Sequence, residues 1–179
     1  MTGTPAGTRL LGLPPQAGAD CRVLILGSMP GAASLAAARY YAHPRNRFWP
    51  LMALLCGIDA GLGHPQRLAA LQAAGLGLWD VIGSCERRGS LDADIVRGSE
   101  VANPLADWLA ARPGIRAVAF NGGTAARAFE RHVGPTLPAA LAARLALHAL
   151  PSTSPANAAF SLERLAAQWS VLSRHLDRP

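Results

Sequence analysis

The sequence contains no lysine, so all seventeen of its basic residues are arginine. They outnumber eleven acidic residues and give a formal net charge of +6. An excess of positive charge is typical of proteins that bind nucleic acid, and the planar arginine side chain can donate two parallel hydrogen bonds to a phosphate. An arginine- and alanine-rich composition also arises from coding bias, so charge alone favours DNA as a partner only weakly. The absence of lysine excludes a P-loop, which ends in Gly-Lys-Ser or Gly-Lys-Thr.

Cysteine is scarce as well. Cys21, Cys56 and Cys85 lie far apart, and no CxxC pair occurs. Cysteine alone therefore cannot build a structural zinc site or an iron–sulfur cluster. No group of cysteine, histidine and carboxylate residues has the spacing of metal ligands either. We expect no metal, no cofactor and a reduced, cytoplasmic setting.

Long apolar runs are missing too, since arginine or proline interrupts each of them well short of a membrane span. We therefore expect no membrane association. Residues 1–20 are rich in Gly, Pro, Thr and Ala and lack the pattern of a signal peptide, which predicts a flexible N-terminal arm. Half of the residues are apolar, enough for one core. We expect a single domain over residues 21–179 and a monomer.

Four short aliphatic runs predict buried strands, at residues 21–27, 76–82, 115–120 and 145–150. Helical periodicity between and after them predicts helices at 46–57 and 65–74, after an Asn103-Pro104 cap, through Phe129, and over Leu162 to Leu176. Strands that alternate with helices favour an open, mainly parallel sheet covered on both faces.

Ligands bind such sheets at the carboxyl ends of the strands. The loop after the first strand is Gly27-Ser28-Met29-Pro30-Gly31, a tight turn whose N–H groups can face an anion or a carbonyl oxygen. It also reads as an ordinary strand-to-helix turn. The loop after the fourth strand, PSTSPAN at 151–157, has hydroxyls between two prolines and is suited to holding phosphate.

The segment YYAHPRNRFWP at 40–50 combines aromatic rings, arginines, a histidine and an asparagine around a proline. A stacking face next to positive charge is what a flipped base and its flanking phosphates require. Phe48 and Trp49 fit the start of a core helix by their periodicity. Tyr41 and Asn46 are the candidates for function.

Five motifs in order, GSMPG, YYAHPRNRFWP, LWDVIGSCERRGSLD, AVAFNG and LPSTSPAN, resemble the uracil-DNA glycosylase superfamily across about residues 21–170. HPRNRFW is similar to a stretch of the mismatch-specific uracil and thymine glycosylases, and the whole set is most similar to the hypoxanthine-DNA glycosylase branch. The resemblance implies a three-layer α/β/α sandwich around a four-stranded, mainly parallel sheet. It also implies metal-free hydrolysis of the N-glycosidic bond of hypoxanthine or uracil flipped out of DNA, which leaves an abasic site.

The resemblance also implies roles for single residues. Met29 replaces the water-orienting Asn or Asp of several relatives, so that Asn46 is left to orient the water, although Asn46 could simply cap the following helix. Tyr41 matches the aromatic residue that stacks on the flipped base. The backbone N–H groups of Ser28 and Met29, next to Gly27, are expected to hold the carbonyl of the base.

Asp80 stands where relatives carry a base-reading Asn. Hypoxanthine and uracil present an N–H donor beside a C=O acceptor, and a carboxylate would accept from the first but repel the second. A base-reading role and a turn-capping role therefore both remain open for Asp80. The residues expected to grip the DNA backbone are Arg45, Arg87, Ser152, Ser154 and Asn157.

Two other classes of function fit the same sequence. One is a catalytically silent protein that binds DNA lesions, suggested by Met29. The other is a small-molecule hydrolase of α/β fold that binds free nucleotide through the GSMPG turn.

Overall fold

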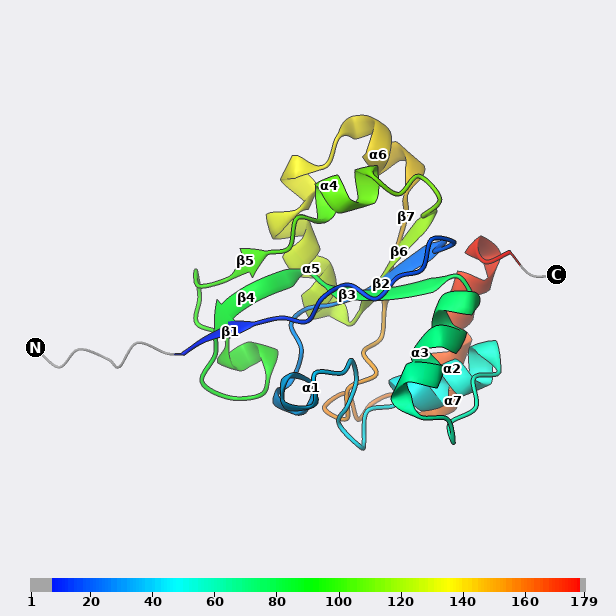
Figure 1. Ribbon diagram of the computed structural model, residues 1–179. Coiled ribbons are helices and arrows are strands. Elements are labelled where there is room, and N and C mark those ends of the chain that lie inside the picture. The colour runs from blue at the N-terminus through cyan, green and yellow to red at the C-terminus, as the bar shows by residue number, and fades with distance from the viewer. Residues whose placement is uncertain (1–7, 178–179) are drawn as a thin grey trace, which may run out of the picture.

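Four parallel strands form the central sheet of the computed structural model, which describes residues 8–177 (Figure 1). They are β2 (Val23–Gly27), β3 (Leu76–Asp80), β6 (Ala117–Asn121) and β7 (Ala146–Leu150), in the spatial order β3-β2-β6-β7. Each neighbouring pair is parallel. The predicted four-stranded parallel sheet is therefore confirmed.

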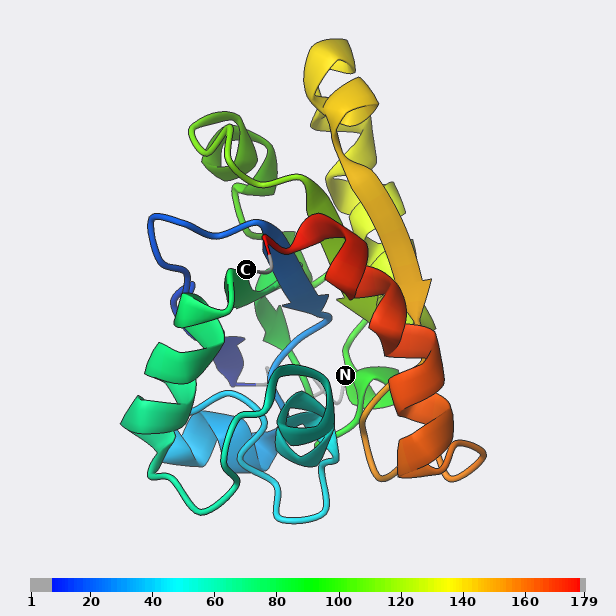
Figure 2. The same cartoon turned by 90° about the vertical axis from the view of Figure 1, so that its right-hand side faces the viewer.

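Helices cover both faces of this sheet (Figure 2). Alternate side chains of β2 point to opposite faces: Val23 and Ile25 join one apolar cluster, and Leu24 and Leu26 join the other. The first cluster includes side chains of α2 (Phe48–Cys56), α3 (His64–Ala73) and α7 (Leu162–Trp169). The second includes side chains of α4 (Leu105–Ala110), α5 (Gly123–His132) and α6 (Ala139–Arg144). This arrangement is the expected three-layer α/β/α sandwich.

A second, antiparallel sheet was not predicted. It consists of β1 (Arg9–Leu11), β4 (Ile82–Glu86) and β5 (Val101–Ala102), in the order β1-β4-β5. The described part of the expected N-terminal arm is therefore not loose. Its strand β1 pairs with β4, and Gln16 forms a bridge with Leu78, because these backbone groups find partners on strand edges. Residues 1–7 lie outside the described part.

The predicted strand 76–82 divides at Val81. Strand β3 ends at Asp80, and the backbone N–H groups of Val81 and Ile82 donate to the carbonyls of Gly27 and Ser28 at 2.9 Å each. The chain then enters the small sheet as β4. These two hydrogen bonds fasten the start of the loop after β2 to the end of β3.

Asn103 does not cap α4 as predicted. Its side-chain amide donates instead to the backbone carbonyl of Asp80 at 2.8 Å, and Pro104 occupies the N-cap position of the helix. The end of β3 is thus held by a side chain from the short segment between β5 and α4.

The predicted C-terminal helix ends at Trp169 and continues as the 3₁₀ helix η3 (Ser170–His175). Trp169 is fully buried, and its indole N–H donates to the carbonyl of Pro151 at 3.0 Å. The helix layer therefore anchors the first residue of the loop after β7. Within residues 8–177, no helix is long and apolar enough to cross a membrane.

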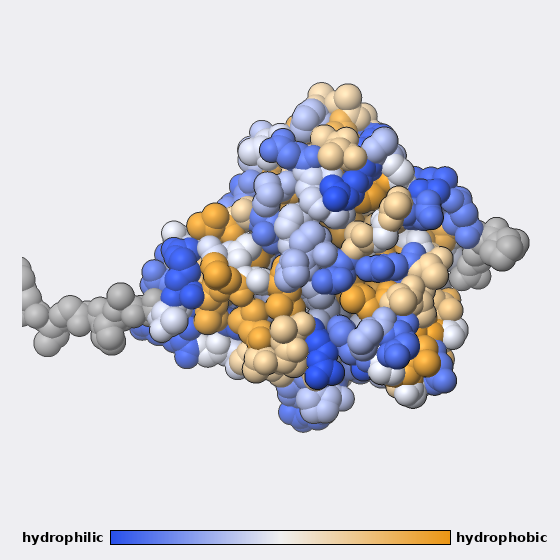
Figure 3. Space-filling view, in the orientation of Figure 1, coloured by the Kyte–Doolittle hydropathy of each residue, from blue (hydrophilic) through white to orange (hydrophobic). Residues whose placement is uncertain are grey.

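Hydrophobic side chains on the face seen in Figure 3 gather over the small sheet, where Leu11 and Val101 are exposed. Short segments complete the fold: α1 (Ala32–Ala37), η1 (Asp92–Asp94) and η2 (Gly134–Thr136). Helix α1 follows β2 and η1 follows β4, and both border the pocket described next.

Candidate active site

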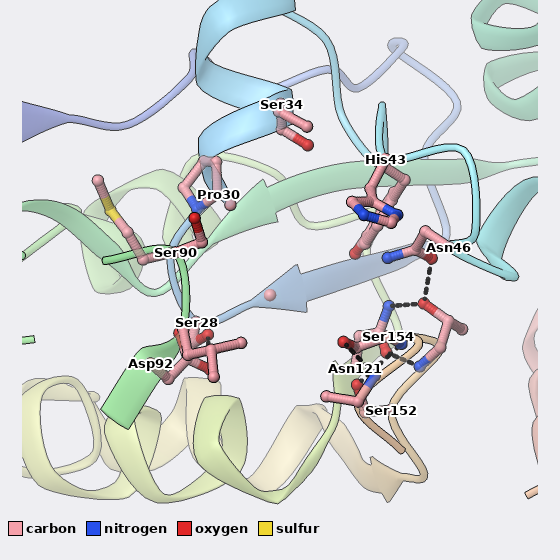
Figure 4. Close-up of a pocket in the computed structure, with 18 of the residues that line it drawn as sticks. Ser28, Pro30, Ser34, His43, Asn46, Ser90, Asp92, Asn121, Ser152 and Ser154 are labelled. Atoms are coloured by element: carbon pink, nitrogen blue, oxygen red, sulfur yellow. Dashed lines mark hydrogen bonds between the residues drawn. The ribbon is translucent and has the colours of Figure 1, made fainter. Parts of the chain in front are cut away.

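A pocket of about 720 Å³ opens at the carboxyl ends of the central strands (Figure 4). Chain connections leave β2 and β6 in opposite directions across the sheet, and such a switch point is where open parallel sheets bind ligands. The volume is typical of a small-molecule site and exceeds that of a single base. The lining includes residues from the four strand ends and two further segments: Gly27, Ser28, Met29, Tyr41, His43, Arg45, Asn46, Asp80, Asp92, Asn121, Ser152 and Ser154.

The loop after β2, residues 27–31, is held firmly from outside the pocket. The Ser28 hydroxyl donates to Asp92 at 2.7 Å, and the Met29 side chain packs against Ile82 and Cys85. The backbone N–H groups of Ser28 and Met29 have no hydrogen-bond partner within the described chain. This loop can therefore offer two N–H donors to a ligand.

Arg87 was expected on the DNA-binding surface, and the structure corrects this. The residue is 7% exposed, and its guanidinium donates to the Pro30 carbonyl at 2.8 Å. A side chain enclosed in this way cannot reach a phosphate on the surface. Its contact instead holds the loop after β2 in place.

Asn46 uses its two ends differently. Its Oδ1 accepts hydrogen bonds from the Phe48 backbone N–H at 3.0 Å and from the Thr153 hydroxyl at 2.9 Å. A peptide N–H can only donate, so the amide oxygen must lie on that side. The Nδ2 group lies on the side of His43 and the pocket (Figure 4). Arg47, and not Asn46, is the N-cap residue of α2, but Asn46 Oδ1 still caps the first N–H group of the helix. The other end of the same amide remains available to a ligand.

Thr153 connects the two walls of the pocket. It is fully buried, and its hydroxyl accepts from Asn121 Nδ2 at 2.9 Å while donating to Asn46. Its own N–H donates to Asn121 Oδ1 at 2.9 Å. This chain of hydrogen bonds joins the end of β6, the loop after β7 and the start of α2, and it fixes the orientation of the Asn46 amide. Sequence reasoning assigned no role to either partner; the only sign was that each stands in a motif that directly follows a predicted strand, Asn121 after 115–120 and Thr153 after 145–150.

Tyr41 stacks on Phe48, with the ring centroids 4.0 Å apart and the planes 19° from parallel. Phe48 covers one side of the ring, and Tyr41 lines the pocket. Its backbone has φ +55°, a strained value for an aromatic residue, of a kind that is found mostly where function requires it. Burial, together with the charge of Asp80, raises the pKa of the Tyr41 hydroxyl, so this group stays protonated.

Asp80 lies at the end of β3, 4% exposed, and lines the pocket. Its Oδ2 is buried without a hydrogen-bond partner. A methyl group on Gly27 would come within 2.5 Å of Oδ1, so only glycine at position 27 lets the carboxyl group lie here. Burial, and secondarily the charge of Asp92, raises the pKa of Asp80 to about 8.

His43, which sequence reasoning set aside, also lines the pocket. Its Nδ1 accepts from the Arg45 backbone N–H at 3.1 Å, which places the ring proton on Nε2. Arg45 also lines the pocket, and the residue is exposed.

The loop after β7, residues 151–157, is braced internally. Ser152 Oγ accepts from the Ser154 N–H at 3.1 Å, and Asn157 Nδ2 donates to the Ser152 carbonyl at 3.0 Å. Arg47 adds hydrogen bonds to the carbonyls of Ser154, Asn157 and Phe160. Ser152 and Ser154 line the pocket with O–H groups that can donate. Asn157 is not among the lining residues, and its side-chain amide donates to a carbonyl within the loop.

In the part of the chain that the structure describes, no three His, Cys, Asp or Glu side chains form a group that could hold a metal ion. The arrangement instead combines neutral hydrogen-bond donors, an aromatic face and a buried carboxyl group. Such a site can bind a planar polar ring and stabilise negative charge that develops on it.

Comparisons with known proteins identify relatives of this chain. The chain matches the Uracil DNA glycosylase superfamily over residues 14–173. A protein of Methanosarcina acetivorans named Hypoxanthine DNA glycosylase is 32% identical over 165 residues, which cover 92% of this chain and 98% of the relative. A protein of the same name from Methanosarcina barkeri is 37% identical over 112 residues, covering 62% and 70%. An NMR structure of a candidate uracil DNA glycosylase from M. acetivorans has a TM-score of 0.76 at 30% identity, covering 94% of this chain and 98% of that one.

Replacing Thr153 tests the hydrogen-bond chain. Thr153→Val keeps the shape but leaves the Asn121 amide without its acceptor, and we expect a loss of about 1–3 kcal/mol in the free energy of unfolding. Thr153→Ser keeps the hydroxyl and loses one methyl group, at a cost of about 1 kcal/mol or less. Urea unfolding of both variants measures the difference. If Thr153→Val were as stable as Thr153→Ser, the result would contradict this chain of hydrogen bonds.

Proposed function

The chain belongs to the uracil DNA glycosylase superfamily, and on that premise we propose that it removes a deaminated base from DNA. The base is hypoxanthine or uracil, flipped out of the helix into the pocket, and the product is an abasic site. Hypoxanthine is the first substrate to test, because the relatives that cover 62–92% of this chain carry that base in their names.

The observation that carries this proposal is that three groups able to contact a base or its sugar line one pocket. Tyr41 offers an aromatic face supported by Phe48, the loop after β2 offers two N–H groups, and Asn46 offers its Nδ2 group. A flipped base needs a stacking surface and hydrogen bonds to its edge, and the sugar needs a positioned water. A different segment of the pocket lining can meet each of these requirements.

The reaction is the hydrolysis of the bond between C1′ and the base nitrogen. This bond breaks with its electron pair going to the base, where the N–H groups of Ser28 and Met29 stabilise the charge. The oxygen of a water adds to C1′, one of its protons passes to solvent, and the departed base takes up a proton. Asn46 Nδ2 donates to that water and holds it near C1′; since an amide is a poor base, it acts by placement.

The DNA backbone is held at the rim of the pocket. Arg45 supplies an exposed positive charge, and the Ser152 and Ser154 hydroxyls supply donors from the braced loop. Contacts of these kinds to phosphate position a protein on DNA without reading its sequence.

Incubation with defined duplexes tests the function. We expect alkali-labile sites in duplexes that contain hypoxanthine, none in undamaged controls, and no loss of activity in excess EDTA. The same assay on duplexes that contain uracil or xanthine establishes which deaminated bases the protein removes. Binding of lesion duplexes without any abasic product would indicate the catalytically silent alternative. Tight binding of free nucleotide without binding of DNA would indicate the small-molecule hydrolase.

Asn46→Ser separates the water-positioning role from the capping role. Serine can still accept from the Phe48 N–H but lacks the Nδ2 donor, so we expect retained binding of lesion DNA and a single-turnover excision rate about a hundredfold lower, roughly 2.7 kcal/mol. The matched control is Ser161→Ala, because Ser161 caps α7 through the Arg164 N–H and does not line the pocket. It should lose about 0.5–2 kcal/mol of stability with unchanged excision. Equal excision rates for both variants would leave Asn46 with only its capping role.

Tyr41→Ala and Tyr41→Phe test the stacking surface. Phenylalanine keeps the ring and its contact with Phe48, so its effect on excision should be mild. Alanine removes a contact worth about 1–3 kcal/mol per base and should lower kcat/KM by about five- to 150-fold. If the two variants had the same rate, the base would not stack on this ring.

A further inference from the structure

Asp80 is the only acidic residue among those lining the pocket that lies on a strand of the central sheet, and it presents an unusual combination of features. Its carboxyl group is buried, one oxygen has no hydrogen-bond partner, and the Gly27 backbone closely approaches the other. No arginine forms an ion pair with it within residues 8–177. Buried polar atoms are almost always satisfied, so an unsatisfied one at a pocket wall marks a place where a ligand bonds.

An ionised carboxyl group at this place would oppose the proposed reaction. The departing base gathers negative charge on its ring and carbonyl oxygens as the bond to C1′ lengthens. A carboxylate can only accept hydrogen bonds, so it would repel that carbonyl oxygen and the growing charge. A protonated carboxyl group carries one O–H donor and one C=O acceptor, and it can pair with an adjacent C=O and N–H of the base.

We infer that Asp80 works as a neutral carboxylic acid that pairs with the adjacent N–H and C=O groups of the flipped base, and that loss of its proton switches excision off. This inference rests on the proposed function and specifies how the site recognises its substrate class. That class consists of bases with a lactam edge, and it includes the deaminated bases hypoxanthine, uracil and xanthine. The O–H of Asp80 donates to the base carbonyl, where the negative charge of the departing base accumulates.

The surroundings of Asp80 favour the neutral form. Its pKa is raised to about 8, mainly because burial penalises the charge and also because Asp92 adds a like charge from η1. Tyr40 and Tyr41 approach from the segment before α2, and the raised pKa values of both hydroxyls keep them uncharged. His43 and Arg45 share the pocket, and Arg45 is exposed at the rim. At neutral pH most of the protein therefore carries a protonated Asp80.

The pH dependence of excision is the decisive experiment. Above pH 8 the single-turnover rate of the wild-type protein should fall about tenfold per pH unit, following the neutral fraction of one acid. Asp80→Asn keeps the shape, can present an N–H donor beside a C=O acceptor, and has no ionisable proton. It should excise hypoxanthine within about tenfold of the wild-type rate at pH 7 and change less than threefold between pH 7 and 9.5. Asp80→Ala removes both partners and should lose at least about a hundredfold at every pH.

Asp92→Asn provides a matched second variant. Removing the negative charge of Asp92 lowers the pKa of Asp80. The excision rate of this variant should therefore begin to fall at a lower pH than that of the wild-type protein. A merely structural role of Asp80 would leave the position of this fall unchanged.

Thermal stability measures the same proton without any substrate. The pKa of Asp80 is about 4 in the unfolded chain and about 8 in the folded protein. Its stabilising contribution is therefore complete below about pH 4 and is lost progressively as the pH rises to about 8. The melting temperature of the wild-type protein should fall relative to that of Asp80→Asn over this range, and the difference should level off above it.

Three results would overturn the inference. One is excision that rises with pH and is abolished by Asp80→Asn, since the carboxylate would then be the active form. The second is the same alkaline fall in wild type and Asp80→Asn, and the third is parallel melting curves for the two proteins. Absence of excision of any base at every pH would instead refute the proposed function, and the melting comparison would still decide whether Asp80 is neutral.

Discussion

All four strands of the central sheet run in one direction, and the placement of the candidate site depends on this constraint. Parallel strands that start together also end together, so the register that pairs Gly27 with Asp80 and Asn121 with Leu150 brings four separate loops to one edge. Helices cover both faces, which leaves this edge as the place where polar side chains can meet a ligand. Residues far apart in the sequence, such as Asn46 and Thr153, which are separated by 107 positions, become neighbours there.

Polar groups at an edge with little access to water must find partners among themselves. Thr153 and Asn121 exchange two hydrogen bonds, and the Thr153 hydroxyl also donates to Asn46 Oδ1. Ser152, Ser154 and Arg47 satisfy the loop after β7 in the same way. Among the groups that line the pocket, those left without a partner in residues 8–177 include Asn46 Nδ2, the backbone N–H groups of Ser28 and Met29, and Asp80 Oδ2. Because unsatisfied polar groups are costly, their concentration in one pocket indicates that the substrate supplies the missing bonds.

Local pattern was enough to predict the sheet and the main helices, because burial on both faces produces continuous aliphatic runs and helix packing produces a 3.6-residue period. The small sheet was missed because its strands are two to five residues long and pair residues as distant as Arg9 and Glu86. In the pocket, Gly27, Tyr41 and Asn46 were predicted from a familiar motif order, and the structure brings them to one pocket. Burial overturned the prediction for Arg87, and the roles of Thr153 and Asn121 depend on contacts that no local pattern encodes.

The proton on Asp80 follows from a contrast between two carboxyl groups of one pocket. Burial raises the pKa of Asp92 as well, but the Ser28 hydroxyl and the charge of Arg87 oppose that rise. Asp80 has no such partner, and the charge of Asp92 raises its pKa further. Two carboxyl groups in different environments can take different chemical roles. Asp92 accepts from the Ser28 hydroxyl and so holds the loop after β2, which leaves Asp80 as the carboxyl group whose proton can meet the negative charge of a departing base.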